Sequence, residues 1–174
     1  MPGLRCQHVA LLLALATFSA GAEEQVMAPE AFLARAFHDE KPAEEVIWLD
    51  APLQSRLRPI LRHAYPRARL SYWRSGRRSA WVLDEIGKEF PITAGFVVQA
   101  GRIERANLLV YRESRGGEIR FPSFLKQFAG QRLDNGDQLS PDVDGVSGAT
   151  LSVDAMRRMA RAALALAAAA DAKL

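Results

Sequence analysis

The chain has 174 residues, about the length of one ordinary domain, and carries 23 basic against 20 acidic side chains. Its arginines are scattered in small groups and no nucleic-acid recognition motif is present, whereas a phosphate-tracking surface needs a continuous basic stripe. The composition therefore argues against nucleic-acid binding, and we expect no nucleic-acid partner.

The amino terminus has the pattern of a secretory signal peptide. Arg5 precedes an unbroken apolar stretch from Val9 to Phe18, and Ala20-Gly21-Ala22 has the small-x-small form that signal peptidases cleave. The stretch is well short of the roughly 20 apolar residues that a membrane-spanning helix needs. We therefore expect residues 1–22 to be a cleaved signal peptide, residues 23–174 to form a single domain, and the protein to be periplasmic.

Cysteine and histidine usage narrows the chemistry of the mature chain. The only cysteine, Cys6, lies before the apolar stretch and would be lost with the signal peptide. Disulfides, thiolate metal sites and cysteine nucleophiles are then excluded. His38 and His63 have no spaced partner carboxylate or third ligand in the sequence, so we interpret them as surface histidines and expect no metal site.

Helical spacing marks the first part of the mature chain. Apolar periodicity predicts a helix over residues 31–37, with Pro29 at a tolerated early position. Asp50 is of the residue type that caps helix N-termini, so a second helix is expected from there toward His63. Pro59 is expected to kink or divide that helix, because proline lacks the N–H that a helix interior uses.

The middle of the chain has the character of β-strands. Four runs are rich in β-branched and aromatic residues and are separated by the turn signals Ser75-Gly76, Gly87 and Gly101. They predict the strands of an antiparallel meander at residues 69–74, 80–86, 92–99 and 103–112.

The last third of the chain returns to helix. Residues 121–128 predict a short helix, with Pro122 near its start and Gly130 as its C-terminal stop. The polar residues 131–146 predict a loop, and a long final helix is expected from about Ser152 to Ala169. The order of elements predicts an α+β fold, in which helices pack on an antiparallel sheet.

The segment that leads into the final helix is Asp144-Gly145-Val146-Ser147-Gly148-Ala149-Thr150. Its glycines allow positive φ or close approach to a ligand, and the first amides of the helix are unpaired donors. A helix end of this kind attracts phosphate, and the macrodipole stabilises an anion there by about 0.3–1 kcal/mol. The simpler alternative is that Thr150 or Ser152 only caps the helix. Geometry alone does not decide between the two.

The run DGVSGAT resembles the flavinylation motif of the FMN-binding domain family, in which Asp, two residues, Ser or Thr, Gly and Ala precede an acceptor Thr. Every one of those positions matches. The resemblance implies that FMN is esterified through its phosphate to Thr150, with Asp144, Ser147, Gly148 and Ala149 completing the motif. It also implies maturation by a separate flavin transferase, which takes FMN from FAD. The family includes the FMN-bearing subunits of the Rnf complex and of the sodium-translocating NADH:quinone oxidoreductase.

A second stretch, YRESRGGEIRFPSFLKQFAG at residues 111–130, is similar to the same family, and the resemblance as a whole spans about residues 80–165. Family members have there a glutamate, a glycine-rich turn and a phenylalanine-rich helix, which implies that Glu113, Gly116 and Gly117 lie at the cofactor site. The turn departs from the E-x-P-G-L-G of the respiratory subunits. The simpler alternative is a glycine turn before a helix that buries its phenylalanines.

Taken with the export signal, the resemblance predicts an electron-transfer flavoprotein outside the cytoplasm. It would accept electrons from a membrane donor and pass them to a redox acceptor protein. We expect a redox carrier with no catalytic side chains of its own; the adjacent Asp84 and Glu85 point to opposite faces of a strand and are no acid–base pair. Two alternatives stay open: a module that binds phosphate or another anion without a covalent bond, and a stand-alone flavin reductase.

Overall fold

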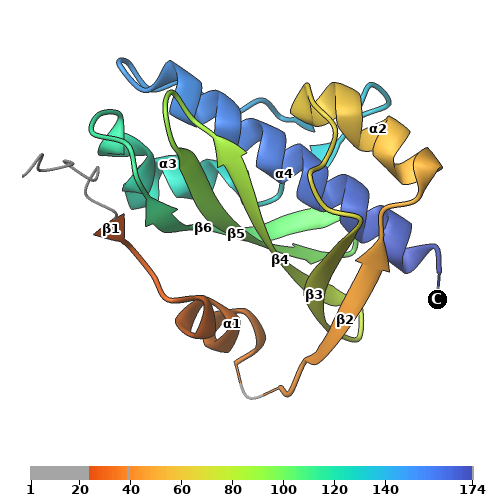
Figure 1. Cartoon of the computed structure of the whole chain (residues 1–174). Coiled ribbons are helices and arrows are strands. Elements are labelled where there is room, and N and C mark those ends of the chain that lie inside the picture. Colours follow the sequence, from red (N-terminus) through yellow and green to blue (C-terminus); the bar gives the residue numbers. More distant parts are fainter. Residues whose placement is uncertain (1–23, 39, 174) are drawn as a thin grey trace, which may run out of the picture.

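The computed structural model describes residues 24–38 and 40–173, which have an α+β fold (Figure 1). The expected signal peptide, residues 1–22, and Cys6 within it lie outside the described residues. Among the helices that are described, none is both long and apolar enough to cross a bilayer.

A six-stranded antiparallel sheet forms the centre of the molecule, in the order β1-β6-β5-β4-β3-β2. The expected meander is confirmed as its middle four strands. Two further strands, which the sequence pattern did not predict, extend the two edges: β1 pairs with β6, and β2 pairs with β3. The strands are β1 (Glu24–Gln25), β2 (Ala43–Trp48), β3 (Arg69–Ser75), β4 (Arg78–Ile86), β5 (Pro91–Gln99) and β6 (Arg102–Tyr111).

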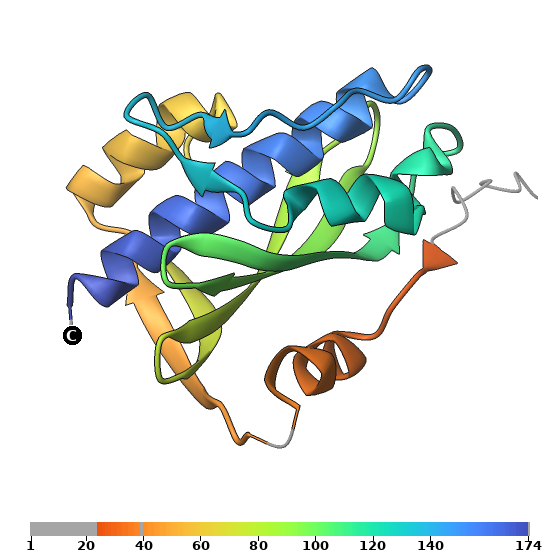
Figure 2. The ribbon, with the colours of Figure 1, turned by 180° about the vertical axis from the view of Figure 1, so that it is seen from behind.

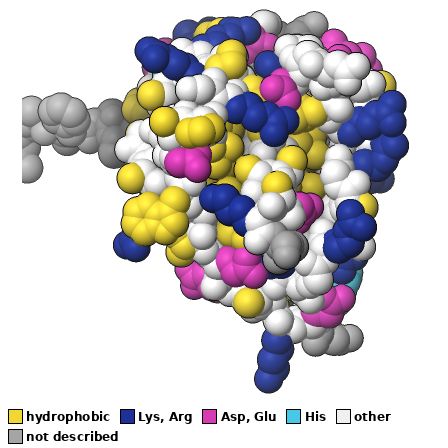
Figure 3. All heavy atoms as spheres, turned by 90° about the vertical axis from the view of Figure 1, so that its right-hand side faces the viewer, with side chains coloured by type: hydrophobic (Ala, Val, Ile, Leu, Met, Phe, Trp, Pro, Cys, Tyr) yellow, Lys and Arg dark blue, Asp and Glu magenta, His cyan; other side chains and the backbone are white. Residues whose placement is uncertain are grey.

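Helices cover both faces of this sheet (Figures 1 and 2). The long helix α4 (Thr150–Asp171) crosses one face and packs against α2 (Ala51–Leu61), while α1 (Pro29–Phe37) lies on the opposite face. The expected first, second and final helices are therefore present. On the face that Figure 3 presents, the basic side chains stand in separate groups with acidic and hydrophobic side chains between them.

Helix α2 begins as expected and continues through Pro59, the second of its two prolines. The Asp50 carboxylate accepts a hydrogen bond from the Leu53 amide at 3.1 Å, so Asp50 is the N-cap. Of the expected kink or division at Pro59, the division does not occur, since the helix runs on to Leu61. Pro59 stands in the last turn, so it removes one hydrogen bond to the carbonyl four residues earlier, and only two helical residues follow it. The chain leaves α2 through Arg62, which has the left-handed φ of 69°.

Helix α4 is held to the sheet by a face of small side chains. Most of its alanines and its two methionines, Met156 and Met159, are buried in the same core cluster as Trp81, Phe96 and Leu108 of the sheet. Small residues allow the helix to approach the sheet closely, and each large apolar side chain that is buried contributes about 1.5–3 kcal/mol. The start of α4, at Thr150, is thereby fixed relative to the sheet.

The segment between β6 and α4 is more irregular than expected. The predicted helix 121–128 consists of the single turn α3 (Pro122–Leu125) followed by a 3₁₀ turn, Lys126–Phe128, and another 3₁₀ turn, Gly117–Arg120, precedes it. Phe124 and Phe128 pack edge to face in the core, which is what the simpler alternative predicts. The expected loop 131–146 contains a small hairpin, β7 (Arg132–Leu133) with β8 (Leu139–Ser140).

Candidate functional site

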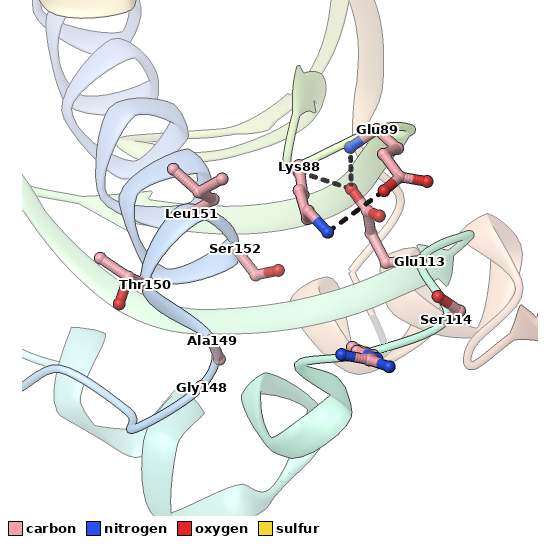
Figure 4. A pocket seen from close by; sticks show the side chains of 10 residues that line it. Lys88, Glu89, Glu113, Ser114, Gly148, Ala149, Thr150, Leu151 and Ser152 are labelled. Carbon is pink, nitrogen blue, oxygen red and sulfur yellow. Dashed lines mark hydrogen bonds and ion pairs between the residues drawn. The ribbon is translucent and has the colours of Figure 1, made fainter.

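A cavity of about 560 Å³ lies at the N-terminus of α4 (Figure 4). Three segments that are far apart in the sequence form it. Two of them lie together because β4 and β6 end, and β5 begins, at the same end of the strands, and the third is the start of α4. The lining residues are Lys88 and Glu89 from the β4–β5 connection, Glu113, Ser114 and Arg115 from the segment after β6, and residues 148–152 at the start of α4.

A tight turn delivers the chain to this helix end. The Ala149 amide donates to the Val146 carbonyl at 3.0 Å, and Gly148 within the turn has a φ of +80°, which glycine adopts without strain. Ala149 is buried, whereas Thr150 is exposed as the first residue of α4. The turn therefore separates an anchored alanine from a threonine that faces solvent and the cavity.

Neither Thr150 nor Ser152 caps the helix, so the simpler alternative for this segment is wrong. The N-cap is Ala149, which has no side-chain oxygen to offer. The Ser152 hydroxyl lies 3.4 Å from the Tyr111 hydroxyl instead. Among the described residues, the Thr150 hydroxyl has no hydrogen-bond partner, which leaves its oxygen available.

The first turn of α4 also has unpaired amide donors. The first helical hydrogen bond runs from the Val153 amide to the Ala149 carbonyl at 2.9 Å. Within the part of the chain that is described, the amides of Thr150, Leu151 and Ser152 have no acceptor. Unpaired amides at a helix N-terminus, together with the macrodipole, stabilise an anion such as a phosphate group. The free hydroxyl and the anion-binding amides thus belong to the same turn.

Glu113 builds the opposite wall of the cavity. One carboxylate oxygen accepts hydrogen bonds from the amides of Lys88, Glu89 and Phe90 at 2.6, 2.8 and 3.1 Å. Burial raises the pKa of Glu113, but these amides outweigh that effect and hold the pKa below its ordinary value. Glu113 therefore stays ionised and ties the β4–β5 connection to the end of β6.

Gly87 makes this arrangement possible. A Cβ at this position would lie 2.8 Å from the Glu113 carboxylate oxygen and 2.9 Å from a methyl carbon of Ile92. The sequence pattern had singled out Gly87 only as a turn residue. Its lack of a side chain is what allows the carboxylate to reach the three amides.

The two glycines of the 116–117 turn support the site from behind without lining the cavity. A Cβ at Gly116, whose φ is +77°, would lie 3.2 Å from both the Ala149 Cβ and the Tyr111 hydroxyl oxygen. A Cβ at Gly117 would meet the Arg120 guanidinium at 2.5 Å. The Tyr111 hydroxyl donates to the Arg115 carbonyl, which joins this turn to the strand that precedes it. Gly116 is thus packed directly behind the residue that precedes Thr150.

The remaining residues of the motif lie outside the cavity. Asp144 and Ser147 are exposed, and the Asp144 amide donates to the Gln127 side-chain oxygen at 2.7 Å. Within the described part of the chain, the Asp144 carboxylate has no partner. Of the eight residues expected at the cofactor site, the cavity brings together Glu113, Gly148, Ala149 and Thr150, and it leaves Asp144, Ser147, Gly116 and Gly117 beside it.

Five lining residues besides Ser152 were not among those expected at the site. Lys88 and Glu89 pair with each other at 3.3 Å, Ser114 and Arg115 follow Glu113, and Leu151 has half of its side chain exposed beside Thr150. The predicted meander could have revealed Lys88 and Glu89, since it places the β4–β5 connection at the same end of the strands as the end of β6.

A second polar cluster lies on the flank of α4. Glu85 is buried on β4, and its carboxylate contacts His63 at 3.0 Å and Arg158 at 3.3 Å. Asp84 is exposed and accepts from Thr93 at 2.6 Å, which confirms that Asp84 and Glu85 point to opposite faces. His63 is half-exposed. Its carboxylate partner, Glu85, is 22 positions further along the chain and was not evident from the sequence.

Comparison with known proteins adds one match. The model of the FMN-binding domain family matches residues 87–165. A search of curated proteins gave no match. The matched segment begins at Gly87 and includes all three segments that line the cavity.

Proposed function

The chain carries a domain of the FMN-binding domain family at residues 87–165 and thus has FMN as its cofactor, and on this premise we propose that it holds FMN covalently and transfers electrons outside the cytoplasm. The proposed linkage is a phosphoester between the phosphate of FMN and the Thr150 hydroxyl oxygen; it forms as the pyrophosphate bond of FAD breaks, with AMP as the leaving group and loss of the hydroxyl proton. The rest of the proposal concerns the chain's own residues: which atom accepts the cofactor, which groups hold it, and which protein completes the attachment.

The observation that carries the proposal is the state of the Thr150 hydroxyl. It belongs to an exposed side chain at the first position of α4, has no hydrogen-bond partner among the described residues, and follows a turn of the sequence DGVSGAT. A threonine that only stabilised the helix would be the N-cap residue, and its hydroxyl oxygen would accept a hydrogen bond from a backbone amide. Thr150 is not the N-cap residue, and its hydroxyl accepts no such hydrogen bond, which favours its role as the FMN attachment site.

The groups around Thr150 suit the phosphate and the ring of FMN. The unpaired amides of the first helical turn can hold a phosphate, and a cavity of about 560 Å³ is within the usual size range for small-molecule and cofactor sites. Arg115 adds positive charge to its rim, the charge of Lys88 is paired with Glu89, and Leu151 adds an apolar surface. When bound, the flavin supplies one- and two-electron chemistry, while the protein holds and orients it.

Attachment is expected to need a separate flavin transferase. No side chain of the described residues is within hydrogen-bonding distance of the Thr150 oxygen, so the chain offers no base that could remove its proton, and an unassisted threonine is a weak nucleophile. The exposed and unpartnered Asp144 carboxylate, six residues before the acceptor, is suited to recognition by that enzyme. The chain's own task is to present the hydroxyl on a rigid helix.

The proposal of a periplasmic carrier is based on the sequence of residues 1–22. Cleavage after Ala22 would leave β1 intact in the mature chain, since β1 begins at Glu24. A covalent bond is useful to such a carrier, because a micromolar affinity of about −8 kcal/mol still allows a cofactor to dissociate. We propose a membrane-bound donor and an exported acceptor protein as its redox partners.

The experiment that tests this function is intact-mass analysis of the mature protein after incubation with transferase, FAD and magnesium. We expect the wild type to gain the mass of one FMN residue, Thr150→Val to gain none, and Thr150→Ser, which keeps a hydroxyl, to gain FMN at a lower rate. Thr150→Val should unfold at the same denaturant concentration as the wild type, since the side chain is exposed.

Three outcomes would contradict the proposal in different ways. Loading of Thr150→Val would move the acceptor to another residue. Tight binding of FMN by wild-type protein without any mass gain would favour the non-covalent module, because the unpaired amides suit that function as well. Rapid turnover of a small organic substrate by the loaded protein alone would favour the flavin reductase.

A further inference from the structure

Four arginines surround a second cavity, of about 430 Å³, on the flank of α4. Three of them lie on α4 itself, at 7, 8 and 11 residues beyond Thr150, and therefore on the same side of the helix as that residue. The fourth ends α2. The charged residues that line the cavity are Arg62, Arg157, Arg158, Arg161, Asp142 and Asp154.

The positive charges in this cavity are only partly neutralised. Arg158 pairs with Glu85 at 3.3 Å, and Arg157 pairs with Asp154 at 3.5 Å and more distantly with Asp142 at 3.9 Å. Within the described residues, neither Arg62 nor Arg161 has a carboxylate oxygen within 4 Å. Arg157 and Arg158 also each bury an Nε–H that has no acceptor. The protein's own groups thus leave both charge and donors unsatisfied at one place, which calls for an explanation.

The conformation around Arg62 points in the same direction. Arg62 has the left-handed φ of 69°, where glycine is the residue normally favoured, so its side chain is retained at some cost to the backbone. Burial lowers the pKa of the Arg161 guanidinium; the charges of Asp137 and Asp134 oppose this effect, and the charge of Arg62 adds to it. Two like charges are therefore held near each other, and an anion between them would relieve the repulsion.

We propose that this cavity is a binding site for a phosphate group, with the Arg62 and Arg161 guanidiniums as its main ligands. Planar guanidinium groups bind phosphate through paired, charge-assisted hydrogen bonds, and several of them suit an anion with more than one negative charge. Arg157 and Arg158 donate through their terminal NH2 groups to the Val143 and Ile86 carbonyls, so they contribute mainly positive potential. Among the described residues, Arg161 donates only its Nε–H, to the Asp137 carbonyl, and would bind through its two terminal amino groups. The cavity is larger than a phosphate ion and has room for the organic part of a phosphate ester.

This site is separate from the phosphate position proposed at the start of α4. Arg161 follows Thr150 by 11 residues, which corresponds to about 16 Å along the helix axis. The second site therefore does not depend on FMN attachment, and it can be tested whether or not Thr150 carries a cofactor.

The test measures binding of inorganic phosphate by calorimetry, at constant ionic strength with chloride as the competing anion. We expect Arg62→Gln and Arg161→Gln each to weaken binding at this site by about tenfold or more, because each removes a charged donor. Arg77→Gln is the matched control: it removes the same charge from the exposed β3–β4 turn and should change the affinity less than about twofold. Arg62→Lys should recover part of the binding.

A parallel arm with phosphatidylglycerol vesicles identifies the source of the phosphate. Vesicle binding that is lost in Arg62→Gln would assign the phosphate to a lipid headgroup, whereas binding of free phosphate alone would assign it to a soluble molecule; both outcomes support a phosphate site. The proposal is overturned if the Arg62 and Arg161 variants, folded as judged by circular dichroism, bind like the Arg77 variant in both arms.

Discussion

Gly116 provides a quantitative test of how the cofactor site is supported. Its φ of +77° lies in the left-handed region, and a Cβ would be 3.2 Å from the Ala149 Cβ and 3.3 Å from the Ala149 Cα. An L-residue in that conformation costs about 1–2 kcal/mol, and overpacking against a fixed neighbour costs about 1–3 kcal/mol more. Gly116→Ala should therefore lower the free energy of unfolding by roughly 2–5 kcal/mol, as measured by urea denaturation.

The matched control is Gly101→Ala. Gly101 has a similar φ of +72°, but no atom lies within 4 Å of its Cβ position, so this variant should show the backbone cost alone. The difference between the two variants isolates the contacts with Ala149 and the Tyr111 hydroxyl. Because Ala149 precedes the acceptor, Gly116→Ala should also slow FMN loading, whereas Gly101→Ala should not. Equal losses of stability and equal loading rates would refute the idea that this turn positions the start of α4.

Three further predictions concern charged groups. The pKa of Glu113 in the folded protein lies below its ordinary value. Its carboxylate therefore stabilises the fold fully above the unfolded-state pKa of about 4.3, and this stabilisation is lost as the pH falls from there through the folded-state pKa. Glu113→Gln should make the free energy of unfolding fall less steeply over this acid range. The pKa of His63 lies above its ordinary value of 6.5, because the Ala64 carbonyl and Glu85 raise it more than burial lowers it. Glu85→Gln should lower the pKa of His63 in an NMR titration. An unchanged pKa would contradict this account. Asp144→Asn should slow loading by the transferase and leave the melting temperature unchanged, whereas a large drop in melting temperature would give Asp144 a structural role instead.

The strands and helices that the sequence predicted are those with strong local signals. Residues 69–112 alternate β-branched and aromatic residues between glycine turns, and they form four strands of the sheet. β2 was missed because it is an edge strand whose pattern is mostly exposed, with Ile47 as its one buried residue. β1 has only two residues, and it exists through pairing with Tyr111 and Val110, which no local pattern contains.

At the site, sequence could find the residues of a contiguous motif but not the groups that face it. Thr150 stands out by its neighbours Gly148 and Ala149, whereas the role of Glu113 depends on three amides that are 23 to 25 positions earlier in the chain. The same limit explains His63, since its partner Glu85 follows in the chain only after an intervening strand. Contacts of this kind are set by the order of strands in the sheet, which local spacing does not encode.

The geometry also gives a physical reason for each residue of the run Gly148-Ala149-Thr150. Position 148 has a φ of +80°, which favours glycine. Position 149 is buried and lies against Gly116, so a side chain larger than alanine would have to displace neighbouring atoms. Position 150 is exposed and starts a helix that the core fixes along its length. Substitutions at 148 and 149 should therefore reduce both stability and FMN loading, whereas substitutions at 150 should affect loading alone, and this difference separates residues that build the turn from the residue that the turn presents.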